Sequence, residues 1–111
     1  MKTAVNIHTE HWNRIIEGLI TENWKLIYKY DQFDAGIDFD FLVLKKGNST
    51  LSFGWDNWEE GEIQGSTVQL EWLSRKFDIP FQYGKPVNLD PKIIALTKFQ
   101  IIYNRIKNKL L

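Results

Sequence analysis

The sequence predicts a single α+β domain, with an N-terminal helix, a four-stranded antiparallel meander and two C-terminal helices packed on the sheet. Three observations lead to this fold class: a helical apolar stripe near the N-terminus, alternating apolar residues through the middle, and two helix-start signals after residue 65. A chain of 111 residues is long enough for one core and too short for two.

The first predicted element is an amphipathic helix that begins near Thr9. Thr9 is the expected N-cap, and Glu10 in the first turn suits the positive end of the helix dipole. The apolar residues recur with the helical spacing of three and four, and they are Trp12, Ile15, Ile16, Leu19 and Ile20.

Alternation of apolar and polar residues predicts four strands, over residues 24–29, 37–44, 51–56 and 60–64. Turn residues separate them, among them Gly36 and the run 45–49. Trp55 follows the inward pattern of Leu51 and Phe53, so it is expected in the core. Trp58 stands at a strand end beside acidic residues, so it is expected to be partly exposed.

Two helices are predicted after the strands. Ser66 and Gln69 form a capping-box pattern, and the helix they begin must end before Pro80. Asp90 followed by Pro91 is a second start signal. The helix after it would bury one face, made by Ala95, Leu96, Phe99, Ile102, Tyr103, Ile106 and Leu110.

Composition excludes several classes of function. The chain has no cysteine, so disulfides, thiolate metal sites and a cysteine nucleophile are excluded. The net charge is zero, which disfavours a nucleic-acid partner. No apolar run is long enough for a signal-peptide core or a membrane span. We therefore expect a soluble, cytoplasmic protein without a cofactor.

The charge is nevertheless segregated along the chain. Residues 31–62 contain eight carboxylates and two lysines, Lys45 and Lys46, which gives this segment a net charge of −6. Such segregation can produce a face of one sign that steers an oppositely charged partner. The predicted binding residues are these acids together with one tryptophan: Asp31, Asp34, Asp38, Asp40, Asp56, Trp58, Glu59, Glu60 and Glu62.

Three interpretations of the acidic segment compete: a solvated sheet face, a protein-binding face and a metal site. The segment lacks the spacing of a calcium-binding loop, which disfavours the metal. His8 and His11 are three apart, but no third ligand is evident, and surface positions are the simpler interpretation. An enzyme using two of the carboxylates also stays open, although the chain has no recognisable catalytic motif.

Residues 33–40 (FDAGIDFD) and 53–63 (FGWDNWEEGEI) resemble small bacterial immunity proteins that are encoded beside contact-dependent or other polymorphic toxins. The resemblance implies a non-enzymatic cytoplasmic protein that binds one cognate toxin domain and blocks it. Many such toxins are nucleases, whose clefts must be basic to hold phosphate. An acidic face with Trp58 as an anchor would suit such a cleft. We expect the protein to be a monomer before the toxin binds. The alternative functions are a small hydrolase-like enzyme that uses paired carboxylates and a general adaptor domain.

Overall fold

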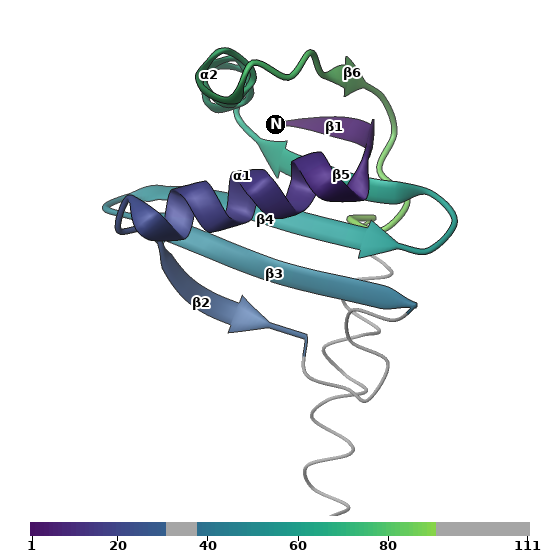
Figure 1. Cartoon of the computed structure of the whole chain (residues 1–111), viewed down its shortest axis with the longest axis horizontal. Coiled ribbons are helices and arrows are strands. Elements are labelled where there is room, and N and C mark those ends of the chain that lie inside the picture. Colours follow the sequence, from purple (N-terminus) through teal and green to yellow (C-terminus); the bar gives the residue numbers. More distant parts are fainter. Residues whose placement is uncertain (31–37, 91–111) are drawn as a thin grey trace, which may run out of the picture.

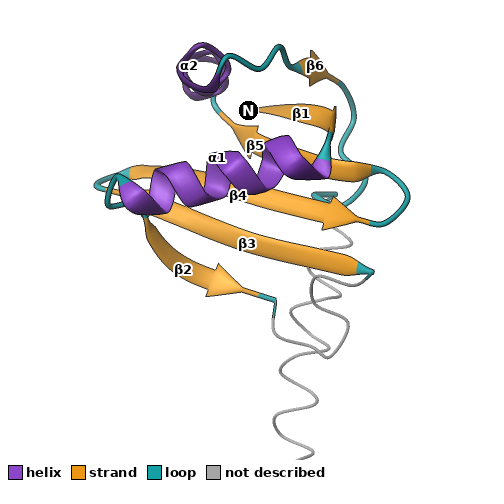
Figure 2. Cartoon of the chain, viewed as in Figure 1, coloured by secondary structure: helices purple, strands orange, loops and turns teal. Residues whose placement is uncertain are grey.

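The computed structural model describes residues 1–30 and 38–90 (Figures 1 and 2). Within them the elements follow in the order β1 (Lys2–Ile7), α1 (Thr9–Thr21), β2 (Lys25–Lys29), β3 (Phe39–Lys46), β4 (Ser49–Asp56), β5 (Glu60–Gly65), α2 (Thr67–Phe77) and β6 (Gln82–Tyr83). None of the helices in these ranges is long and apolar enough to cross a bilayer.

The strands form one six-stranded antiparallel sheet in the order β2-β3-β4-β5-β1-β6. β2 to β5 are a meander, and β1 returns from the start of the chain to lie between β5 and β6 (Figure 2). The turn between β3 and β4 contains Gly47 with a φ of +59°, a conformation that glycine adopts without steric cost.

The predicted order of elements is wrong in three respects. A strand, β1, precedes the N-terminal helix, and the sheet has six strands rather than four. The described ranges contain two helices, of which α2 alone follows the meander. The helix predicted from Asp90 onward falls on residues 91–111, outside the described residues. The four predicted strands correspond to β2, β3, β4 and β5.

Both helices pack on one face of the sheet. The buried stripe of α1 meets the inward residues of β3 and β4 in one core, which also includes Leu70 and Leu73 of α2. Trp55 is buried in this core, as predicted, and its indole N–H donates to the Thr9 hydroxyl at 2.9 Å. Thr9 is the predicted N-cap, but α1 begins at Thr9 itself, so His8 is the N-cap residue, and its side chain makes no capping hydrogen bond.

The capping-box prediction is confirmed at α2. The Ser66 hydroxyl accepts from the Gln69 backbone N–H at 3.1 Å, and the Gln69 side chain accepts from the Ser66 N–H at 2.8 Å. Two of the N–H groups that every helix start leaves unpaired are thus satisfied. α2 ends at Phe77, before Pro80, as the sequence predicts.

The opposite face of the sheet carries a second, smaller cluster. Tyr30, Phe41 and Leu89 are buried together there. Leu89 approaches the sheet closely at Gly54, where a β-carbon would lie 2.9 Å from two Leu89 carbons. The segment that follows β6 is thus held against the face that lacks α1 and α2.

Gly61 provides a test of the main core. A β-carbon at this position would lie 2.5 Å and 2.7 Å from two atoms of the Trp12 indole. We expect Gly61→Ala to lower the free energy of unfolding by about 1–3 kcal/mol, because the indole must move within a packed core. Urea unfolding measures it. Gly84→Ala is the control, since its β-carbon would meet only the two Val5 methyls, at 3.2 Å and 3.8 Å. An equal loss in both variants would contradict the packing argument.

Candidate functional site

The ends of β3, β4 and β5 bring together several acidic residues that are separated in sequence. The register pairs Phe39 with Asp56 across β3 and β4, and Asp56 with Glu60 across β4 and β5. The backbone N–H of Asn57 donates to the Asp38 carbonyl at 3.2 Å. Asp38, Asp56 and Glu60 therefore share one end of the sheet.

The turn between β4 and β5 presents Trp58 to solvent. Its side chain is 77% exposed, which agrees with the predicted exposure. The Asp56 carboxylate accepts hydrogen bonds from the backbone N–H groups of Trp58, at 2.9 Å, and of Glu59. These bonds fix the turn, so the indole stands on an ordered support. We call Asp38, Asp56, Trp58, Glu59 and Glu60 the acidic tip.

The start of α1 adjoins the acidic tip through a contact that sequence analysis missed. His8 Nδ1 lies 3.0 Å from a Glu60 carboxylate oxygen, although the two residues are 52 positions apart. An adjacent cavity of about 370 Å³ is lined by His8, Thr9, Glu10, His11 and Glu60. No local pattern could reveal this contact, because it depends on how α1 crosses the sheet.

Two of the predicted binding residues are absent from this surface. Asp40 is 9% exposed; it lies on the α1 side, opposite Trp55 in the register, and accepts from the Lys29 ammonium at 3.1 Å. Glu62 is 1% exposed and lies on the other face. Its carboxylate accepts from the backbone N–H groups of Val87, at 2.8 Å, and Leu89, at 3.0 Å. Both carboxylates are therefore structural.

The remaining predicted acids, Asp31 and Asp34, lie outside the described residues. Within the described ranges, no group of three or more histidine, cysteine, aspartate or glutamate side chains is placed to hold a metal ion. The acidic tip therefore offers an exposed indole and carboxylates for contact with another molecule.

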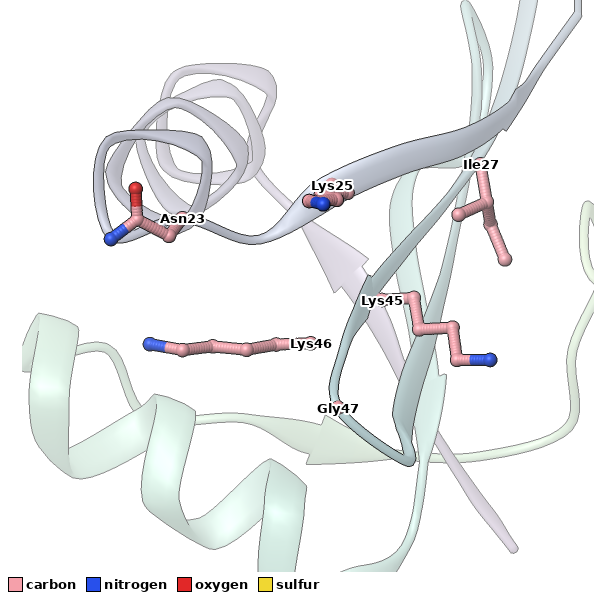
Figure 3. A pocket seen from close by; sticks show the side chains of 6 residues that line it. All are labelled: Asn23, Lys25, Ile27, Lys45, Lys46 and Gly47. Atoms are coloured by element: carbon pink, nitrogen blue, oxygen red, sulfur yellow. The ribbon is translucent and has the colours of Figure 1, made fainter.

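The other end of the meander is basic. Lys25 of β2 lies directly opposite Lys45 of β3, and Lys46 follows beside the turn at Gly47. These side chains, with Asn23 and Ile27, line a cavity of about 270 Å³ (Figure 3). Since β3 runs from Phe39 to Lys46, the acidic and basic residues occupy opposite ends of the same strands (Figure 1).

Comparison with known proteins yields no significant match to a family model, a curated protein or a solved structure.

Proposed function

We propose that this chain is a non-enzymatic, cytoplasmic binding protein that neutralises a cognate bacterial toxin domain through its acidic tip. The observation that carries the proposal is Trp58, 77% exposed on a turn fixed by Asp56. Exposed aromatic side chains that become buried in a partner often dominate binding energy. A turn that is already ordered loses little conformational entropy when it binds.

The charges around Trp58 favour a basic partner surface. Asp38 and Glu59 are exposed beside it, and Glu60 is partly exposed. Acidic groups at an interface accelerate encounter with a basic surface and contribute to the choice of partner. A nuclease cleft has this character because it must hold phosphate. Fast association matters for an inhibitor whose target is lethal when free.

The resemblance of residues 33–40 and 53–63 to immunity proteins supports the toxin as the partner. A general adaptor domain would use the same surface with a different protein. The hydrolase-like alternative has less support, because Asp40 is paired with Lys29 and both Glu62 oxygens are bound by backbone N–H groups. Neither carboxylate is placed to act on a substrate.

We expect Trp58→Ala to weaken binding of the proposed cognate toxin domain by about 30-fold, equivalent to about 2 kcal/mol. The loss arises because the indole no longer fills a pocket on the partner. Titration calorimetry with the purified toxin domain measures it, and rescue of cells that express the toxin gives a second readout.

Tyr83→Ala is the matched control, since Tyr83 is also an exposed aromatic residue but lies in β6. It should leave affinity and rescue unchanged. Both variants should keep the unfolding midpoint within a few degrees of the parent, because both side chains are exposed. Equal affinities for the Trp58 variant and the parent protein would refute the acidic tip as the binding surface.

A further inference from the structure

A second surface, at the end of the meander away from the acidic tip, contains a groove. An apolar groove of about 340 Å³ lies between α2 and the sheet, and it is lined by Trp24, Ser49, Val68, Gln69, Trp72 and Arg75. Trp24 and Trp72 stack with ring centroids 6.3 Å apart, so two adjacent indoles line the groove. Val68 is 74% exposed and Trp72 is 37% exposed.

Cations surround this groove. Arg75 lines it, and the Lys76 ammonium lies 5.5 Å from the Trp72 ring centroid. Lys46 donates to the Glu22 carbonyl at 2.9 Å, next to the Glu22 carboxylate that pairs with Lys76. We call these three cations, Lys46, Arg75 and Lys76, the basic end. Lys25 and Lys45 (Figure 3) are cross-strand neighbours on the opposite face of the sheet, the face of Phe41 and Val43, and are not part of it.

The positive charge beside the groove is only partly neutralised. Lys76 pairs with the Glu22 carboxylate. Lys46 lies opposite Ser49 in the register, and in the described ranges neither Lys46 nor Arg75 is in an ion pair. An acidic group placed against these two cations would pair with them, so the surface favours an acidic ligand with an apolar anchor.

We propose that the groove and the basic end bind the acidic tip of a second copy of this chain, with Trp58 inserted between Val68 and Trp72. The tip supplies the two features that the groove requires, one exposed indole and a border of carboxylates. Complementary charge would orient the two surfaces.

The contact must be between molecules. The eight residues of β3 separate the two ends, which corresponds to about 25 Å along an extended strand. Trp58 therefore cannot reach the groove of its own chain. Pairing of two copies through the edge strand β2 is disfavoured, because Lys25 of one copy would oppose Lys29 of the other.

The expected association is weak and salt-dependent. One tip in one groove buries less than the ~800 Å² per partner of a standard interface, and exposed charges are screened by salt. At low concentration the protein is then a monomer, and at high concentration Trp58 is covered. This inference does not rest on a toxin as the partner. If both proposals hold, the toxin and the second copy compete for Trp58.

Sedimentation velocity of the protein alone tests the inference. Between about 10 µM and 1 mM, the range of weak association, the mean mass of the parent protein should rise, and added salt should lower it. Trp58→Ala and Arg75→Glu should each reduce self-association at least tenfold. Mixing the two variants should produce a dimer and nothing larger, because each contributes one intact surface.

Lys85→Glu is the control for charge, because Lys85 is exposed and lies away from the groove; it should associate like the parent protein. Circular dichroism on each variant confirms that it is folded. A parent protein that stays monomeric at the highest concentration overturns the inference, and leaves the groove to a different acidic partner. Failure of the mixed variants to form a dimer overturns it as well. The sedimentation experiment contains no toxin, so a failure of the proposed toxin binding would not change these masses. The two proposals can therefore be refuted independently.

Discussion

Replacing Glu62 by alanine should lower the free energy of unfolding by about 3 kcal/mol, because hydrogen bonds to a charged group contribute about 1.5–3 kcal/mol each. Two such bonds hold the segment after β6 against the sheet, from the N–H groups of Val87 and Leu89. Leu89 is fully buried, so its N–H would be left without an acceptor and without water. The packing of Leu89 against Gly54 and Phe41 depends on the same anchor.

Glu62→Gln is the matched variant. It keeps the size of the side chain and one acceptor oxygen, but its NH₂ group would face one of the two backbone N–H donors, those of Val87 and Leu89. We expect roughly half the loss of the alanine variant. Urea unfolding gives the free energies, and hydrogen exchange should accelerate at Val87 and Leu89 before the main core. If Glu62→Ala lowers the free energy of unfolding by less than about 0.5 kcal/mol, the carboxylate does not anchor this segment, and Glu62 becomes a candidate binding residue again.

Local patterns predicted the elements that have one buried side. The α1 stripe, the alternation in β4 and the capping box at Ser66 each depend on neighbouring residues. Each prediction agrees with the structure, except that Ile20 of the α1 stripe is exposed. β3 also agrees, although both of its faces are partly covered: Leu42 and Leu44 meet α1, while Phe41 meets Leu89.

The missed strands lack such patterns. β1 buries Thr3, Ala4 and Val5 in succession, because it lies between β5 and β6 with both faces covered; buried runs of this kind show no alternation. β6 has two residues, too few for any period. Pairing of the first strand with β5, about 60 residues later, depends on the whole fold and leaves no local signal.

The same limit applies to the binding surface. Antiparallel pairing of the predicted second and third strands implies that Asp38 lies near the sheet end that carries Asp56 and Trp58, and the hydrogen bond from the Asn57 N–H to the Asp38 carbonyl agrees. Charge counting could not separate exposed acids from buried ones. Asp40 and Glu62 have the same charge as Glu59, but Lys29 and two backbone amides surround them. Lys29 is 11 residues from Asp40 in sequence, and Val87 and Leu89 are 25 and 27 residues from Glu62.

A charge-reversal variant that tests the acidic tip should therefore change exposed acids and leave Asp40 and Glu62 intact. We expect Asp38→Lys combined with Glu59→Lys to slow association with the proposed toxin partner by about tenfold to a hundredfold at low salt, the range of electrostatic steering. The dissociation rate should change less, because exposed charges at a rim act mainly on encounter. Stopped-flow kinetics at several salt concentrations measure both rates, and the salt dependence of association should flatten or reverse.

The control is Glu17→Lys combined with Glu71→Lys, which makes the same change in net charge on exposed positions of α1 and α2. If net charge alone governed the encounter, both double variants would slow it equally. If the position of the charge governs it, the tip variant slows association far more, because a Debye length of about 10 Å at 0.1 M salt confines the field to nearby groups. Equal rates for the tip variant and the parent protein would refute steering by the tip, while Trp58 would retain its separate test through affinity.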